Sequence, residues 1–219
     1  MKAIVVLSGG LDSTTVLYHA VKKYDEVEAI SFDYGQKHRK ELLCAMWHCD
    51  HLKIKHKTIK LDFSCFKSSL LSGGDDIPEG HYASDNMKST VVPFRNGIML
   101  AYAVGYAENV GADSVLIGSH SGDHTIYPDC TKEFTDHMGL ASQFGTYNEV
   151  TIVSPFNDKM KWDLVKIGND LGIDYSMTWS CYKGGDKPCG KCGTCVERIE
   201  AFEKNNLIDP IEYEKEVKE

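Results

Sequence analysis

Six consecutive residues near the start of the chain, Ser8-Gly9-Gly10-Leu11-Asp12-Ser13, have the composition of an anion-binding loop. They follow an apolar run and precede a helical pattern from Thr14 to Lys23, which predicts a strand, a tight turn and a helix. Glycines let the backbone approach a ligand closely, and the first N–H groups of a helix have no partner within it. The loop therefore predicts a phosphate site.

This loop lacks the lysine of a Walker A motif, so its side chains offer only hydroxyl groups and one carboxylate to a ligand. Ser8 and Ser13 can donate to phosphate oxygens, whereas Asp12 suits Mg²⁺ or the orientation of the loop. The pattern S-G-G-x-D-S resembles the pyrophosphate-binding loop (PP-loop) of the ATP pyrophosphatase superfamily, whose members adenylate a substrate oxygen and release pyrophosphate. The resemblance implies ATP as the cofactor bound by residues 8–13; an ordinary Gly/Ser turn is the alternative.

Four of the eight cysteines form a second group with metal-binding spacing, C-x7-C-x2-C-x2-C. Two-residue spacers let successive thiolates converge on one ion, and four thiolates close a tetrahedral Zn²⁺ shell without a position for substrate. We therefore predict a structural zinc site, with an iron–sulfur cluster as the alternative because the same ligands serve either metal. The predicted ligands are Cys181, Cys189, Cys192 and Cys195.

Polar residues that follow a second apolar run, Val27 to Tyr34, are candidates for binding adenosine or substrate. The end of the second strand of a nucleotide-binding sheet lies near ribose and base, so Asp33 and Tyr34 are candidate nucleotide ligands. Gln36 and His38 come directly after them and are candidates for contacting the substrate.

Two cations are candidates for stabilising phosphate charge. Arg95 stands at the start of a predicted helix, where its planar guanidinium suits a phosphate. Lys161 follows the last predicted strand and is a candidate for neutralising charge at the scissile phosphate. The alternatives are a surface arginine paired with an acid and a solvated helix lysine.

Acidic residues gather after the fourth predicted strand, around the polar segment 118–124 and beyond it. Asp129 and Glu133 share a helix face if Asp129 begins the helix. Carboxylates here can bind Mg²⁺ or receive a ligand edge that presents two N–H donors. Capping of the helix N-terminus by Asp129 is the structural alternative.

A sheet must bring these scattered residues together, and the hydrophobic pattern predicts one. Apolar runs at 3–7, 27–34, 54–61, 114–118 and 150–153 alternate with helical patterns, and the third run has the polar alternation of an edge strand. Alternation of this kind predicts an α/β fold with a doubly wound, mainly parallel five-stranded sheet, which collects ligands beyond the carboxyl ends of its strands. The PP-loop resemblance implies the adenine nucleotide alpha hydrolase-like variety of this Rossmann-like fold.

We divide the chain into an ATP-binding α/β domain, residues 1–178, and a zinc-binding segment, residues 179–219, packed on the same domain. Residues 62–90 break the alternation of strands and helices, which favours a lid or inserted loop over the site; a mobile surface loop is the alternative. A chain of 219 residues has room for one sizeable core but for no additional glutaminase domain.

Charge and hydropathy exclude several classes of partner. The net charge of −8 argues against direct, sequence-independent binding to nucleic acid. No apolar run is long enough to span a bilayer, and the chain opens on a core strand rather than a cleavable signal. We therefore expect no membrane partner and a cytoplasmic protein.

Taken together, the motifs resemble the 7-cyano-7-deazaguanine synthase family of the queuosine pathway, from residue 1 to about 204. The matching segments are Ser8 to Ser13, Phe32-Asp33-Tyr34-Gly35-Gln36, Pro93-Phe94-Arg95-Asn96-Gly97, Tyr127-Pro128-Asp129-Cys130 with Glu133-Phe134, and the four cysteines.

The resemblance implies a ligase that uses ATP and Mg²⁺ to convert 7-carboxy-7-deazaguanine and free ammonia to the nitrile. Catalytic roles then fall on Asp12, Ser13, Arg95 and Lys161, and substrate contacts on Asp129, Glu133, Gln36 and His38. We expect a homodimer. The alternatives are another PP-loop adenylating enzyme such as a tRNA thiolase, and a non-catalytic, zinc-stabilised nucleotide-binding module.

Overall fold

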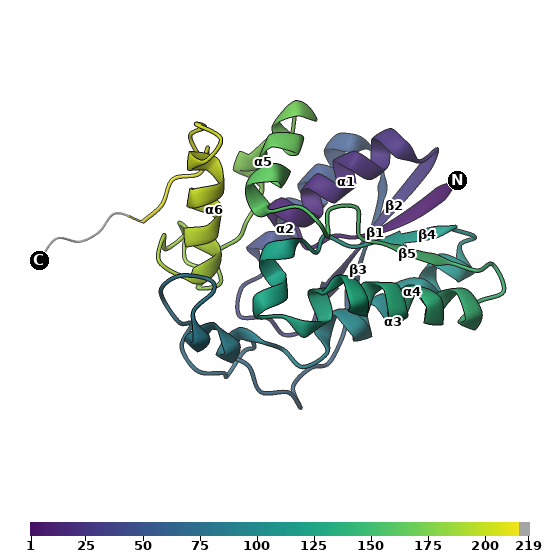
Figure 1. Ribbon diagram of the computed structural model, residues 1–219, viewed down its shortest axis with the longest axis horizontal. Coiled ribbons are helices and arrows are strands. Elements are labelled where there is room, and N and C mark those ends of the chain that lie inside the picture. Colours follow the sequence, from purple (N-terminus) through teal and green to yellow (C-terminus); the bar gives the residue numbers. More distant parts are fainter. Residues whose placement is uncertain (215–219) are drawn as a thin grey trace, which may run out of the picture.

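The computed structural model describes residues 1–214, which form a five-stranded parallel sheet with helices on both faces (Figure 1). Every pair of neighbouring strands is parallel, and the spatial order is β3-β2-β1-β4-β5. The prediction of a doubly wound sheet with its third strand at the edge is confirmed. The strands are β1 (Lys2–Val6), β2 (Glu26–Asp33), β3 (Lys55–Lys60), β4 (Ser114–Leu116) and β5 (Thr151–Val153).

Helices cover the two faces of the sheet in separate groups. Figure 1 shows α1 and α5 on one face and α3 and α4 on the other, while α6 stands beside α5 at the end of the molecule. The helices are α1 (Leu11–Lys23), α2 (Lys40–Leu52), α3 (Arg95–Asn109), α4 (Lys132–Gly145), α5 (Lys161–Asp170) and α6 (Gly193–Glu203). None of the helices in the described part of the chain has the length and apolar character needed to cross a membrane.

The side-chain alternation of the central strand separates the core into two apolar layers. Ala3 and Val5 of β1 belong to the layer that contains Leu17 of α1 and Leu164 of α5, whereas Ile4 belongs to the opposite layer. All of these side chains are buried. Successive side chains of a strand point to opposite faces, so the continuous apolar run of β1 is what a sheet covered on both sides requires.

Residues 62–90 lie across the carboxyl end of the sheet and contain a short 3₁₀ helix, Asp85–Thr90. Leu70, Leu71 and Met87 are buried. Isolated backbone bridges join Leu71 to Gln36 and Glu79 to Cys192, so this segment connects the end of β2 with the cysteine segment. Its function as a lid stays a prediction.

The sequence analysis did not predict the helix α6, which begins within the cysteine motif at Gly193. It packs beside α5, and its Arg198 is buried. Arg198 donates to Asp209, to Thr178 and to the carbonyl of Tyr175, which attaches α6 to the chain on both sides of it. The proposed boundary at residue 178 stays a prediction, and residues 215–219 of the zinc-binding segment lie outside the described residues.

Candidate active site

The glycine-rich loop lies where the winding of the sheet reverses. The chain runs from β1 outward through β2 to β3, then returns past β1 to β4 on its other side. Such a switch point opens a crevice beyond the strand ends. Residues 8–13 follow β1 and extend into this crevice. Gly118, which follows β4, packs against them so closely that a Cβ on it would lie 3.0 Å from the Ser13 backbone.

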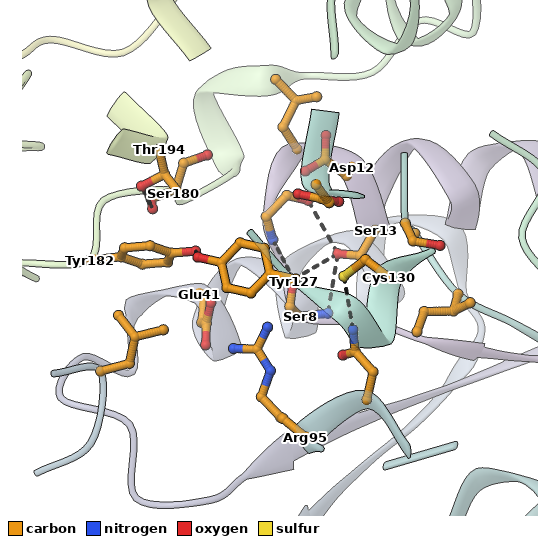
Figure 2. A pocket seen from close by; sticks show the side chains of 18 of the residues that line it. Ser8, Asp12, Ser13, Glu41, Arg95, Tyr127, Cys130, Ser180, Tyr182 and Thr194 are labelled. Carbon is orange, nitrogen blue, oxygen red and sulfur yellow. Dashed lines mark hydrogen bonds between the residues drawn. The ribbon is translucent and has the colours of Figure 1, made fainter. Parts of the chain in front are cut away.

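Backbone N–H groups of the loop converge on two serine hydroxyls. The Ser13 hydroxyl accepts from the N–H of Ser8 at 3.1 Å and of Gly9 at 3.3 Å, and the N–H of Gly10 donates to the Ser8 hydroxyl at 3.2 Å. The two hydroxyl oxygens are 2.9 Å apart (Figure 2). Successive N–H groups that point to one place form the kind of concavity that binds anions. Phosphate binding by the loop stays a prediction.

Gly9 is held so tightly that no other residue fits. Its φ is +89°, and a Cβ would lie 1.8 Å from the carbonyl oxygen of Glu41 on α2. Its own carbonyl accepts from the Trp179 N–H at 3.1 Å. The loop is thereby fixed between α2 and the segment that leads to the cysteines.

A buried group of charged residues lies beside the loop, and it joins α1, α5 and α6. The Nζ of Lys161 is 2.6 Å from Glu197 Oε2 and 3.2 Å from Asp12 Oδ2. Burial alone would lower the pKa of Lys161, but the carboxylates of Asp12 and Glu197 outweigh burial and raise this pKa above its usual value. Lys161 is therefore charged throughout the physiological range.

His120, which follows β4, adds a proton donor to this group. Its Nδ1 accepts from the Gly122 N–H, so the proton of the neutral ring is on Nε2. That nitrogen lies 3.6 Å from Asp123 and 3.8 Å from both Asp12 and Glu197. Three carboxyl groups thus surround one lysine and one histidine.

The opposite wall of the same cavity, whose volume is about 230 Å³, carries Arg95, Tyr34 and Glu41. Arg95 is the first residue of α3, and its Nη1 donates to the Tyr34 hydroxyl at 3.3 Å. Figure 2 shows Arg95 and Glu41 near each other on the side of the cavity that also holds Tyr127 and Tyr182. The hydroxyls of those two tyrosines are 3.4 Å apart.

The cavity brings together most of the residues singled out in the sequence, but not all of them. Its lining includes Ser8, Gly10, Leu11, Asp12, Ser13, Tyr34, Gln36, His38, Arg95 and Lys161. Burial lowers the pKa of His38 to about 4, so the ring is neutral at physiological pH. Asp33 lies outside this lining, in a shallow depression beside Arg39, to which it is paired at 3.4 Å.

The predicted common helix face of Asp129 and Glu133 is wrong, because α4 begins at Lys132 and is capped by the Thr131 hydroxyl. Asp129 instead accepts from the Asn96 N–H at 2.8 Å, in the first turn of α3 next to Arg95. Glu133 is exposed on α4. Neither side chain lines the cavity, and Asp129 caps the helix that carries Arg95.

Sequence reasoning missed Glu41 and Glu197, and it noted His120 only as part of a polar segment. Glu197 stands two residues after the last cysteine of the metal motif, which was a usable signal. Glu41 had no comparable mark, since it looks like an ordinary acid in the first turn of a helix.

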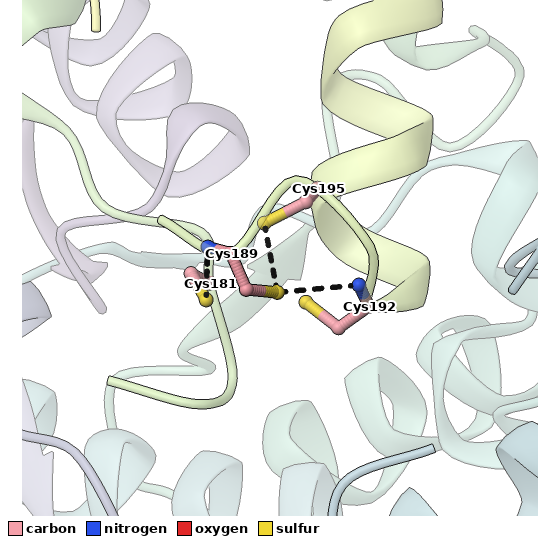
Figure 3. Close-up of side chains that lie close together, drawn as sticks. All are labelled: Cys181, Cys189, Cys192 and Cys195. Atoms are coloured by element: carbon pink, nitrogen blue, oxygen red, sulfur yellow. Dashed lines mark hydrogen bonds between the residues drawn. The ribbon is translucent and has the colours of Figure 1, made fainter. Parts of the chain in front are cut away.

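The four predicted metal ligands come together and are all buried (Figure 3). Their Sγ atoms lie within 4.8 Å of one another, and those of Cys189 and Cys195 are 4.0 Å apart. N–H groups of Lys191 and Cys192 donate to the Cys189 sulfur, which stabilises a thiolate. The cluster can bind a metal, and α6, with Glu197, begins within it.

The family model of the queuosine biosynthesis protein QueC matches residues 2–206.

The chain belongs to the QueC family.

Curated relatives are similar to this QueC protein over nearly its whole length. The 7-cyano-7-deazaguanine synthase of Pseudoalteromonas atlantica is 52% identical over 215 residues, which are 97% of this chain and 99% of the relative. The synthase of Caldicellulosiruptor saccharolyticus is 50% identical over 219 residues, which are 99% of this chain and 97% of the relative. The chain is therefore an enzyme, and the whole-chain resemblance predicted from the motifs is confirmed.

A solved structure supports the fold. The NMN synthetase of Francisella tularensis aligns with a TM-score of 0.52 and 15% identity, over 84% of this chain and 68% of the other. At this level of identity the likeness concerns the fold alone. The family match favours the synthase prediction over a tRNA thiolase and over a non-catalytic nucleotide-binding module.

Proposed function

We propose that this QueC protein uses ATP to convert 7-carboxy-7-deazaguanine and free ammonia into 7-cyano-7-deazaguanine. The observation that carries the proposal is the shared cavity, in which the N–H loop and Lys161 lie on one side and Arg95 on the other. The synthases that resemble the chain over its whole length supply the substrate class.

The proposed chemistry follows from the weakness of a carboxylate as an electrophile. Transfer of AMP to a carboxylate oxygen makes that oxygen a leaving group, so that ammonia can replace it and give the amide. A second adenylation, on the amide oxygen, permits dehydration to the nitrile. The loop N–H groups and Lys161 stabilise the charge that develops on the phosphates, and Arg95 can hold the anionic group of the substrate.

Two metals fit the residues that are present. The Oδ1 atom of Asp12 is buried and has no hydrogen-bond partner among the described residues, and with Asp123 it supplies the oxygen ligands that Mg²⁺ prefers. When bound, this ion would neutralise phosphate charge. The sulfur separations of the cysteine cluster suit zinc, whose tetrahedral thiolate shell places sulfurs about 3.8 Å apart. A zinc ion there would hold the start of α6 in place.

The remaining predictions concern partners, and the sequence supports them. Free ammonia as the nitrogen donor stays a prediction, and the acidic charge argues against direct contact with nucleic acid. A homodimer and a cytoplasmic location also stay predictions. Gln36 and His38 line the cavity as proposed substrate contacts, whereas the same role for Asp129 and Glu133 would require them to enter it.

Mass spectrometry of the products tests the proposal directly. Incubation with ATP, Mg²⁺, ammonium and 7-carboxy-7-deazaguanine is expected to give the nitrile together with AMP and pyrophosphate. Ser13→Ala removes a hydroxyl from the loop and is expected to lower the rate by about 10²–10³-fold. Ser176→Ala, at an exposed position outside the cavity, should match the wild type. Bound ATP without any nitrile would refute the proposed substrate.

A further inference from the structure

Of the carboxyl groups in the cavity lining, Glu41 is the one that lies near Arg95 (Figure 2) rather than in the group around Lys161 and His120. It lies in the first turn of α2, whose backbone contacts the loop at Gly9. Within residues 1–214, no lysine, arginine or histidine forms an ion pair with it. A carboxyl group that faces a reaction cavity without a cationic partner is available to exchange protons with a ligand.

The orientation of Glu41 is fixed by Gln36. The Oε1 of Gln36 accepts from the Tyr34 N–H at 2.8 Å, and its Nε2 donates to the Phe32 carbonyl at 3.1 Å. These two backbone partners leave only one orientation for the amide. In that orientation Nε2 also donates to Glu41 Oε1, at 3.3 Å. One carboxylate oxygen is therefore held by Gln36, in a carboxyl group that lines the cavity.

The surroundings give this carboxyl group the acidity of a base that works near neutral pH. Burial raises the pKa of Glu41 to about 7, while the Arg95 charge and the Gln36 hydrogen bond oppose the rise. The other titratable groups facing it are Tyr34, at the end of β2, and Cys44, on α2 itself, and burial keeps both neutral by raising their pKa values. A proton acceptor is most effective when its pKa lies near the working pH.

The proposed reaction needs such an acceptor at three points. In the first, the nitrogen lone pair of ammonia forms the C–N bond, the C–O bond to AMP breaks, and nitrogen must lose one proton to give the neutral amide. In the second, the amide oxygen attacks the α-phosphorus of a second ATP, pyrophosphate leaves, and nitrogen loses another proton. In the third, the C–O bond breaks again, AMP leaves with its electron pair, and loss of the last N–H proton forms the C≡N bond.

We propose that Glu41 is a catalytic residue of this enzyme, the general base that removes the protons from the substrate nitrogen. The inference rests on the proposed function. Gln36 is then a positioning residue for Glu41, in addition to lining the cavity. Between steps the carboxyl group returns its proton to solvent. Adenylation of the carboxylate itself releases pyrophosphate without loss of a proton, so this first step needs no base.

The first adenylation needs no base, whereas the later steps do, and this difference provides the test. In Glu41→Gln, the exchange of labelled pyrophosphate into ATP, measured with 7-carboxy-7-deazaguanine, is expected to stay within a few-fold of the wild type. Conversion of the amide to the nitrile with ATP is expected to fall by roughly 10²–10⁴-fold in kcat, with little change in KM. Glu41→Asp keeps the carboxylate and should restore part of the rate. Asp50→Asn, an exposed change on the same helix, should behave as the wild type.

The pH dependence of the amide step gives a second readout, because this step uses no ammonia. In the wild type the rate should rise as pH increases through about 7, where Glu41 ionises, and Glu41→Gln should lack this inflection. Normal nitrile formation by Glu41→Gln, a change in KM alone, or equal loss of exchange and of nitrile formation in both Glu41 variants would each overturn the assignment. No nitrile from the wild type would instead refute the proposed function, and the role of Glu41 with it.

Discussion

Replacement of Gly9 by alanine tests how firmly α2 holds the loop. A left-handed φ of +89° costs a residue with a Cβ roughly 1–2 kcal/mol. The new Cβ would also lie 1.8 Å from the Glu41 carbonyl oxygen and 2.8 Å from the Ala45 nitrogen, both of them backbone atoms. Relief of such a clash requires the loop and α2 to separate, which costs about 1–3 kcal/mol more. The expected loss of stability is therefore about 2–5 kcal/mol.

Gly111 provides a control that separates the cost of a left-handed φ from the cost of the steric clash. Gly111 has a φ of +68°, and a Cβ on it would have no atom within 4 Å, so Gly111→Ala should lose only about 1–2 kcal/mol. In urea, with a slope of about 2 kcal/mol per molar, the midpoint of Gly9→Ala should lie about 0.5–1.5 M below that of the control. Pyrophosphate exchange should be lost in Gly9→Ala alone, because its N–H groups no longer converge. Equal midpoints together with normal exchange in both variants would refute this account of the loop.

Three further predictions follow from buried groups. Lys161→Met leaves two carboxylates without their cation, so the variant should lose about 3–5 kcal/mol of stability. The double variant with Glu197→Leu should regain stability but not activity. Thermal unfolding measures the stability, and nitrile formation measures the activity. Elemental analysis is expected to find roughly one zinc per chain. Cys192→Ser should lose this zinc, whereas Cys65→Ser, at an exposed position, should keep it. Iron together with sulfide would contradict the assignment of zinc. Burial lowers the pKa of His48 to about 4, so the unfolded chain binds its proton first, and stability should fall as pH decreases from about 6.5 to 4. His48→Gln should flatten that acid limb in urea titrations, and an unchanged slope would contradict the burial argument.

Features encoded by neighbouring residues were the ones that the sequence predicted well. The loop and the cysteine motif each lie within a short segment, and their spacing alone limits what they can bind. The parallel sheet followed from the alternation of strands and helices, and the edge position of its third strand followed from the polar alternation of that strand. The order of the other strands came only from the structure. Contacts between distant segments were not predictable in this way, and Glu197 meets Lys161 only because α6 packs beside α5.

The helix boundary near Asp129 shows why local signals can mislead. Asp129 and Thr131 are both good N-cap residues, and they stand two positions apart. The hydroxyl of Thr131 caps α4, which frees Asp129 to cap a different helix, α3. Only the tertiary fold decides between two such candidates, so the sequence assigned the right residue type to the wrong helix.

The charged group beside the loop also has a consequence for the order in which the protein is made. Asp12 belongs to α1 and Glu197 to α6, the first and the last helix in the described part of the chain, yet both contact the same lysine. The nascent chain can form the loop and the Asp12 contact early, but Glu197 reaches Lys161 only after α6 has emerged. Synthesis therefore completes the sheet well before it completes the charged group of the catalytic pocket.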